Sequence, residues 1–238
     1  MKVALISDTH GIALPPIEHD TDFILHAGDI CPDKFFQHRD RRNAHLGQME
    51  WIENDLRKWY NDNGQIPLYG TWGNHDFIGE QLCNYNHKGI HINQNKQMEI
   101  EGLKVWFSPW VSLINGTWAF ETRNDRWGDI PLDTQVVVTH CPPKGIGDIV
   151  VTGHENWGLY ENVGSGFLLQ RLLQLKDLRL VVCGHIHEGR GAYWLQKLGC
   201  PVYNVSALNE RYQPVAEPVV YVEWDTLVRE GEGYGFGV

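Results

Sequence analysis

Four short stretches of the chain are hydrophobic at every position. They are Val3-Ala4-Leu5-Ile6, Phe23-Ile24-Leu25, Val136-Val137-Val138 and Leu180-Val181-Val182. Runs of this length without polar alternation, rich in β-branched residues, are typical of strands that are buried on both faces. They predict the core strands of an α/β sheet that is covered on both sides.

Helical spacing of apolar residues predicts two helices. One extends over residues 47–63 and ends at Gly64, a residue type that favours helix C-termini. The other begins after Ser165, whose hydroxyl is a candidate N-cap. Strands are predicted at 2–7, 22–27, 66–72, 97–101, 103–108, 135–139, 179–183, 191–195, 201–205 and 218–223.

The rest of the chain contains no repeat, low-complexity linker or domain boundary. Residues 109–134 are expected to form a loop with one short helix, and residues 141–164 a long functional loop. We expect residues 1–238 to form a single domain, with a frayed tail at 226–238.

Metal-binding residue types cluster where these strands end. The segments are Asp8-Thr9-His10, Gly28-Asp29, Gly73-Asn74-His75-Asp76, Thr139-His140 and Gly184-His185-Ile186-His187. Because ligands gather at the carboxyl ends of strands in open α/β sheets, these segments should meet at one edge. Apart from Asp76, the edge would hold two carboxylates, one amide and five imidazoles, which is enough for two metal ions.

The order of these five elements resembles that of the calcineurin-like metallophosphoesterases. That family is marked by D-x-H, G-D, G-N-H-D/E, a lone His and G-H-x-H. The resemblance implies a four-layer α/β sandwich of two mixed β-sheets flanked by helices. It also implies a dinuclear metal site at the C-terminal ends of the strands.

The resemblance also implies the ligands of each metal. One metal would be held by Asp8, His10, Asp29 and His187, and the other by Asp29, Asn74, His140 and His185. Asp29 would therefore bridge the two. Mixed nitrogen and oxygen donors suit divalent transition metals; manganese is our expectation, with iron, zinc, nickel and cobalt left open.

His75 is expected to be the general acid or charge stabiliser beside the leaving oxygen, oriented by Asp76. Asn74 and His75 would contact the substrate, and a hydroxide bridging the metals would attack phosphorus in line. His26, three residues before Asp29, is expected to support the ligands from behind.

Within the family, the C-terminal motifs look closest to the small MPPED-type phosphodiesterases. The matching pieces are Thr139-His140-Cys141-Pro142-Pro143, Gly184-His185-Ile186-His187-Glu188-Gly189 and Tyr203-Asn204-Val205-Ser206. This branch implies hydrolysis of small phosphodiesters such as cyclic nucleotides. A phosphomonoesterase acting on nucleotides or phosphoproteins is the alternative, and a non-catalytic protein-binding scaffold is a third interpretation.

Composition narrows the partners. A formal net charge of -10 disfavours binding to long nucleic acid. The family resemblance implies a small phosphoester, a nucleotide above all, as the substrate. Five cysteines without a C-x-x-C pair predict a reducing, cytoplasmic location. No signal peptide or membrane span is expected, and the oligomeric state stays open.

Several residues near the motifs have two interpretations. Trp118 and Phe120 either stack on a base or pack in the core. Arg190 either meets a phosphate or lies solvated at the surface. His154 is a candidate substrate contact in the long loop. Three cysteines close to presumed ligands are either small packing residues or oxidation-sensitive thiols: Cys31, Cys141 and Cys183.

Overall fold

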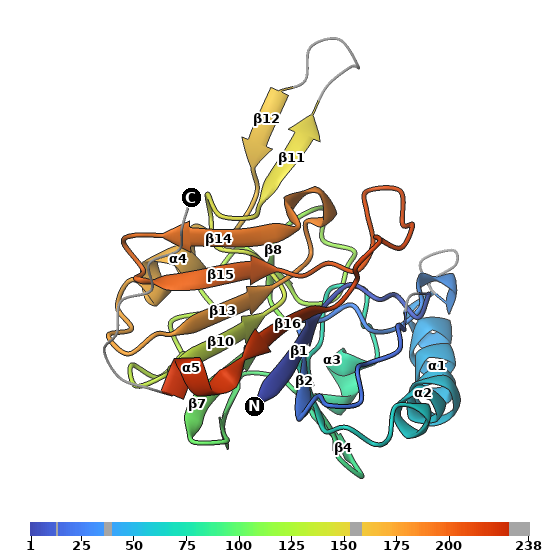
Figure 1. Cartoon of the computed structure of the whole chain (residues 1–238). Coiled ribbons are helices and arrows are strands. Elements are labelled where there is room, and N and C mark those ends of the chain that lie inside the picture. Colours follow the sequence, from blue (N-terminus) through green and yellow to red (C-terminus); the bar gives the residue numbers. More distant parts are fainter. Residues whose placement is uncertain (13, 36–39, 153–158, 229–238) are drawn as a thin grey trace.

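Two mixed six-stranded β-sheets lie face to face in the computed structural model, which describes residues 1–12, 14–35, 40–152 and 159–228 (Figure 1). The first sheet has the strand order β16 (Val220–Glu223), β1 (Lys2–Ile6), β2 (Phe23–His26), β3 (Leu68–Thr71), β5 (Ile90–Asn93), β4 (Tyr85–His87). The second has the order β14 (Gly191–Leu195), β15 (Cys200–Asn204), β13 (Leu180–Cys183), β10 (Val136–Thr139), β7 (Leu103–Ser108), β6 (Lys96–Ile100).

In each sheet the four inner strands are parallel and the two edge strands are antiparallel to their neighbours. The carboxyl ends of the inner strands of a sheet therefore lie at one edge.

The hydrophobic runs form strands because both of their faces are buried. In β1, Val3 and Leu5 pack between the two sheets, whereas Ala4 and Ile6 pack on the outer face of the first sheet. In β10, Val136 and Val138 face the space between the sheets, and Val137 faces outward. Alternate side chains of a strand point to opposite faces, so burial of both faces leaves no polar position in the run.

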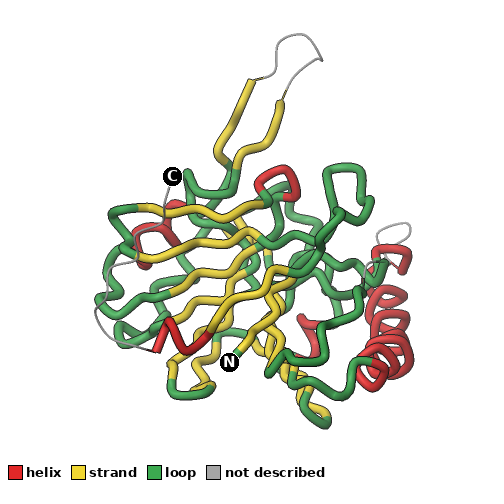
Figure 2. Tube along the Cα trace, viewed as in Figure 1, coloured by secondary structure: helices red, strands yellow, loops and turns green. Residues whose placement is uncertain are grey.

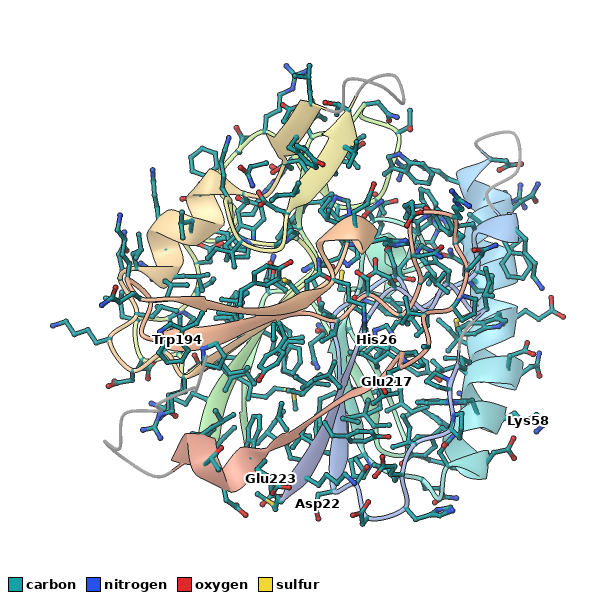
Figure 3. The ribbon with its side chains drawn as sticks, turned by 45° about the horizontal axis from the view of Figure 1, so that its top comes forward. Asp22, His26, Lys58, Trp194, Glu217 and Glu223 are labelled. Carbon is teal, nitrogen blue, oxygen red and sulfur yellow. The ribbon has the colours of Figure 1, made fainter. Side chains whose placement is uncertain are left out.

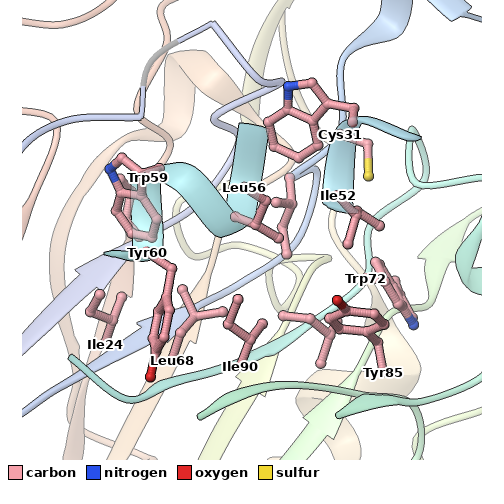
Figure 4. Close-up of a cluster of buried hydrophobic side chains, with 14 of the residues drawn as sticks. Ile24, Cys31, Ile52, Leu56, Trp59, Tyr60, Leu68, Trp72, Tyr85 and Ile90 are labelled. Carbon is pink, nitrogen blue, oxygen red and sulfur yellow. The ribbon is translucent and has the colours of Figure 1, made fainter. Parts of the chain in front are cut away.

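One nearly continuous helical segment covers the outer face of the first sheet. It consists of α1 (Arg41–Trp51), a π-helical turn (Ile52–Leu56) and α2 (Arg57–Asp62). Its apolar side chains face those of the sheet, as Figure 4 shows for Ile52, Leu56, Trp59 and Tyr60 above Ile24, Leu68 and Ile90.

This segment begins six residues earlier than expected. Asp40 caps it by accepting hydrogen bonds from the backbone N–H groups of Arg42 and Asn43. The first turn consists mainly of polar residues and has no apolar stripe, so hydrophobic periodicity does not mark the start of the helix.

The outer face of the second sheet is covered by α4 (Gly166–Leu172). Ser165 caps this helix, as predicted, through a hydrogen bond from the Leu168 backbone N–H to its Oγ at 3.1 Å. Leu168 and Leu172 pack against the outward side chains of β10 and β13. Helix, sheet, sheet and helix make the four-layer α/β sandwich that was expected.

The long connections differ from expectation. Residues 109–134 contain the paired short strands β8 (Val111–Ser112) and β9 (Glu121–Thr122) and no helix. Within 141–164, β11 (Ile149–Thr152) and β12 (Leu159–Asn162) form a hairpin that extends away from both sheets (Figure 2).

The remaining helices are short. They are α3 (Gly79–Leu82), α5 (Trp224–Val228) and 3₁₀ turns at Asp33–Phe35 and His187–Gly189. The predicted frayed tail begins inside α5, and residues 229–238 lie outside the described residues. In the part of the chain that is described, no helix combines the length and apolarity that crossing a membrane requires.

Candidate metal centre

Four of the predicted site residues have an unusual backbone conformation. Asp8, His10, Asp29 and His185 have φ angles of 52°, 44°, 53° and 68°. A positive φ is strained for any residue with a Cβ, and it persists only where the surroundings enforce it. Here it turns the chain sharply just after β1, β2 and β13.

Asp29 lies at the middle of the cluster. Its Oδ2 is 3.2 Å from Nε2 of His140, 3.7 Å from Nε2 of His10 and 4.0 Å from Nε2 of His75. Its Oδ1 accepts a hydrogen bond from the backbone N–H of His75 at 2.8 Å. One carboxylate oxygen is thus surrounded by three imidazole nitrogens from three different loops.

Asp8 lies beside the Gly184–His187 turn. Its Oδ1 is 3.4 Å from Nε2 of His187, and the backbone N–H of His185 donates to the carboxylate at 3.0 Å. Ser206 donates its hydroxyl to Oδ2 of Asp8 at 2.9 Å. The carboxylate is fully buried and held from two sides.

Asn74 and His185 adjoin His140. Oδ1 of Asn74 is 3.0 Å from Nε2 of His140, and the imidazole of His185 has its centroid 5.0 Å from that of His140. The predicted residues of both metal sets therefore lie together at the carboxyl ends of the inner strands.

The orientation of the histidines suits metal binding. Nδ1 of His140 donates to the carbonyl oxygen of Ala27, and Nδ1 of His187 donates to that of Asn209, both at 2.9 Å. Such bonds leave the Nε2 lone pair free for a metal and fix the ring direction. Nε2 of His10 is buried without a hydrogen-bond partner among the described residues.

Three groups of three residues each bring their donor atoms together, and within a group these atoms lie within 4.8 Å of one another. They are Asp8, His10 and His187; His10, Asp29 and His75; and Asp8, Asp29 and His140. A buried, orphaned imidazole nitrogen beside carboxylates fits a divalent transition metal, whose affinity for nitrogen and oxygen donors is high.

Charges within the cluster perturb one another. Burial alone would raise the pKa of Asp29, but the imidazoles of His140 and His75 hold it well below its ordinary range. Burial alone would lower the pKa of His140, yet Asp29 raises it to about 9. Burial and the neighbouring His140 lower the pKa of His185 to about 3. The centre therefore favours buried carboxylates in their anionic form next to a positive charge.

His75 is oriented by a different acid from the one expected. Its Nδ1 lies 2.7 Å from Oδ1 of Asp33, which is also 3.1 Å from Nδ1 of His10. Asp76 instead accepts hydrogen bonds from the backbone N–H groups of Ile30, Cys31 and Gly73. Its carboxylate is occupied by the backbone, so the orienting role assigned to Asp76 belongs to Asp33.

Asp33 was missed in the sequence because it belongs to no recognised element. It follows the Gly28-Asp29 pair by only four residues, on the same loop after β2. An acid at this distance from a predicted ligand is the signal that would have identified it.

His26 lies behind the centre at the end of β2 (Figure 3). Its Nδ1 accepts the backbone N–H of Gly28 at 3.2 Å, which leaves Nε2 to donate to Oγ1 of Thr9 at 3.2 Å. Burial lowers its pKa to about 3. A neutral His26 thus joins the two loops that carry Asp8 and Asp29.

Two aromatic side chains flank the histidines. Tyr212, which is 41% exposed, has its ring centroid 5.0 Å from that of His10 and 5.1 Å from that of His187. Trp118 packs on His75, with centroids 4.2 Å apart and planes inclined by 31°. Sequence reasoning did not find Tyr212, because its loop lies far along the chain and matches no motif.

Arg190 adopts neither of the roles considered for it. Its guanidinium donates to the carbonyl oxygens of Ser206 and Glu217 and so ties loops together. The three cysteines near the ligands, Cys31, Cys141 and Cys183, are fully buried, and burial raises the pKa of each thiol. They pack beneath the centre, whereas His154 lies outside the described residues.

Two motif glycines leave room for the carboxylates. A Cβ on Gly73 would overlap Asp29, and a Cβ on Gly184 would overlap both Asp8 and the hydroxyl of Ser7. Any side chain at either position would displace a central acid, which explains glycine there in physical terms.

Comparison with known proteins agrees with this geometry. Residues 1–189 match the family model described as calcineurin-like phosphoesterase. Metallophosphoesterase domain-containing protein 1 of Homo sapiens is 32% identical over 254 aligned positions, covering 92% of this chain and 70% of that protein. The Mus musculus protein of the same name gives the same values.

A third relative is much longer than this chain. The probable rhamnogalacturonate lyase C of Emericella nidulans is 27% identical over 206 positions, covering 80% of this chain but 17% of that protein. The family match includes nine of the twelve strands of the two sheets and every ligand motif, and the human relative covers most of the chain. This chain therefore belongs to the calcineurin-like phosphoesterases and is a metal-dependent phosphoesterase.

Proposed function

We propose that the chain hydrolyses small phosphodiesters, cyclic nucleotides among them. The observation that carries the proposal is the position of His75. Its Nδ1 is held by Asp33, so its Nε2 points toward Asp29, 4.0 Å away, at the margin of the ligand cluster. A proton donor held beside two buried carboxylates and four further imidazoles is the arrangement that phosphoester cleavage needs.

We assign the metal ligands as the family resemblance implies. One set is Asp8, His10, Asp29 and His187, and the other is Asp29, Asn74, His140 and His185. The short distances around Asp29 and the orphaned His10 nitrogen support this assignment. Bound divalent metals would supply Lewis-acid stabilisation of phosphoryl charge and a nucleophilic hydroxide at neutral pH.

The remaining chemistry belongs to side chains of the protein. Asp33 fixes the ring of His75, and Nε2 of His75 donates a proton to the departing oxygen. Asn74 and His75 contact the phosphoryl group. Trp118 and Tyr212 limit access of water to the histidines that they flank.

Preference for a diester rests on charge. A diester carries one negative charge, whereas a monoester dianion is commonly bound by a bidentate arginine. Arg190, the arginine that follows the His185–His187 motif, is bound to backbone carbonyls instead. The MPPED-type motifs around His140 and His187 support the same substrate class.

A substrate panel tests the proposal. Chelated protein is reloaded with manganese and assayed on bis-aryl phosphate and cyclic nucleotides, and in parallel on aryl phosphate and nucleoside monophosphates. The diesters should have the higher kcat/KM. A preference for the monoesters would replace the proposal with a phosphomonoesterase. The assay is repeated with iron, zinc, nickel and cobalt, and inactivity on every substrate with every metal would favour a non-catalytic protein-binding scaffold.

A further inference from the structure

A cavity of ≈ 410 Å³ opens on the surface near the metal centre. This volume lies in the range of small-molecule sites. Three of its lining side chains are aromatic and one, Leu113, is aliphatic, whereas the others are polar residues and a glycine. The aromatic lining residues are Trp110, Trp118 and Phe120, and the polar ones include Arg41, Gln94 and Glu121.

The cavity adjoins the active residues through Trp118. The ring of Trp118 lies against His75, with centroids 4.2 Å apart. The next residue, Ala119, donates its backbone N–H to the carbonyl oxygen of Asn74 at 3.0 Å. The wall of the cavity is therefore hydrogen-bonded to the same segment that carries His75.

We infer that this cavity binds the heteroaromatic base of a nucleoside that carries the leaving oxygen. The inference rests on the proposed function, because it takes His75 as the residue that protonates that oxygen. The group attached to the leaving oxygen must lie on the side of His75, and the cavity is on that side. In a nucleoside cyclic phosphate the leaving oxygen belongs to the ribose, which stays bonded to phosphorus through its other ester oxygen, so the base of that nucleoside extends toward the aromatic walls.

The ionic side chains of the cavity stabilise its walls. Arg41 pairs with Glu80 and donates to the carbonyl oxygens of Thr117 and Trp118. Glu121 accepts the backbone N–H groups of the segment, from Ile114, Asn115 and Trp118. Since these charges are paired, the cavity offers aromatic surface to an uncharged planar ring.

Gln94 lines the same cavity and would supply the polar contact. Its Oε1 is buried and has no hydrogen-bond partner among the described residues. A buried acceptor without a partner is costly unless a ligand satisfies it. The amino group of a nucleobase is a donor that fits, which makes an amino-bearing base the preferred ligand.

The test compares two diesters that differ only by the base. They are adenosine 2′,3′-cyclic phosphate and methyl ribofuranoside 2′,3′-cyclic phosphate. Trp118→Leu should lower the kcat/KM ratio of the first to the second by roughly ten-fold, the value of one stacked base. Gln94→Leu should lower it by about two- to ten-fold, through KM, without changing the base-free reaction.

Two further variants serve as controls. Trp118→Phe keeps an aromatic face and should retain most of the preference for the base. Trp194→Leu removes a 46%-exposed tryptophan on β14, away from His26 and its neighbours (Figure 3), and should leave the ratio unchanged. Equal losses for both substrates in Trp118→Leu, with no effect of Gln94→Leu, would overturn the inference and leave Trp118 as a support for His75.

A binding measurement separates this inference from the proposed function. Adenosine has no phosphate, so calorimetric titration of the manganese-loaded protein with adenosine reports the cavity without a contact between phosphate and metal. Binding that weakens in Trp118→Leu and Gln94→Leu supports the cavity even if diester hydrolysis fails. Hydrolysis of both diesters without adenosine binding or base preference would show that the cavity binds no base, and it would leave the proposed function intact.

Discussion

One oxygen atom of Asp33 serves two histidines with different assigned roles. Oδ1 lies 3.1 Å from Nδ1 of His10 and 2.7 Å from Nδ1 of His75. A carboxylate on Nδ1 fixes the ring and makes Nε2 more basic. Burial would raise the pKa of Asp33, but the two imidazoles lower it to about 2, so the acid is anionic at neutral pH. Asp33 thus couples a proposed metal ligand to the proposed proton donor.

Replacing Asp33 should therefore affect both histidines. Asp33→Asn is expected to lower kcat/KM by roughly 10–100-fold, the usual effect of removing such a partner. The loss should be larger for a nucleoside leaving group than for nitrophenolate, because an activated leaving group needs no proton from His75. Asp133→Asn, which changes an exposed acid paired with Lys104, is the control. An unchanged leaving-group dependence would show that Asp33 does not act through His75.

At the residue scale, the sequence predicted which side chains the fold brings together where they lie in compact motifs near strand ends. His140 directly follows β10, and Asp8 and Asn74 lie two and three residues after β1 and β3, so each strand places its side chain within narrow limits. Asp33 and Tyr212 could not be found this way. Their roles arise from contacts across the fold, as between Asp33 and His75, which are 42 positions apart.

Among the structural elements, the loop after β2 and the loop after β3 are joined by Asp76. Its Oδ1 accepts the N–H of Cys31 at 2.8 Å, and its Oδ2 accepts those of Ile30 at 3.2 Å and Gly73 at 2.8 Å. The side chain is fully buried. These bonds hold Asp29 and Asn74 at a fixed separation, although Asp76 does not contact the substrate side of His75.

Asp76→Asn should therefore lower the stability of the fold more than it affects catalysis. An amide has only one acceptor oxygen, so at least one buried backbone N–H would face an NH₂ group. We expect the free energy of unfolding in urea to fall by about 2–4 kcal/mol. Asp62→Asn, at an exposed pair with Lys58, should change it by less than about 0.5 kcal/mol. A large loss of kcat in Asp76→Asn at unchanged stability would instead favour the catalytic role first expected for it.

A substitution of Gly184 tests how closely the turn after β13 approaches the end of β1. Gly184→Ala would place a methyl group on Asp8 and on the hydroxyl of Ser7. Because Asp8 is held by Ser206 and His185, the overlap should cost more than about 2 kcal/mol and reduce metal content. Gly166→Ala is the matched control: no atom lies within 4 Å of its Cβ position at the start of α4. Equal stability and metal content in both variants would contradict the close approach.

At this scale the sequence predicted the strands that carry a continuous hydrophobic run but not several short strands without one. β4 and β5 are short strands that carry several polar residues, so no continuous hydrophobic run marks them. Residues 109–134 were expected to form a loop with one short helix. Hydrogen bonds between backbone atoms of Val111 and Phe120, and between those of Ala119 and Asn74, favour extended structure instead.

For the whole molecule, the metal centre is also the place where the two sheets are joined. The first sheet and its loops supply Asp8, His10, Asp29, Asn74 and His75, and the second supplies His140, His185 and His187. Beyond β1, Ser7 pairs with Ser206, which follows β15 of the other sheet. Metal ions bound by both sets of residues would therefore link the sheets, and folding should depend on them.

Thermal unfolding measures this dependence without relying on activity. A ligand that binds only the folded chain at 100 times its Kd adds about 2.7 kcal/mol of stability. For a chain of 238 residues this corresponds to a rise in Tm of roughly 5–10 °C between chelator and manganese. Asp29→Asn, which alters the proposed bridge, should show a much smaller rise, whereas Asp133→Asn should keep the full one. The same Tm in chelator and in saturating manganese would mean that these donors hold no metal in the folded chain, whatever their geometry.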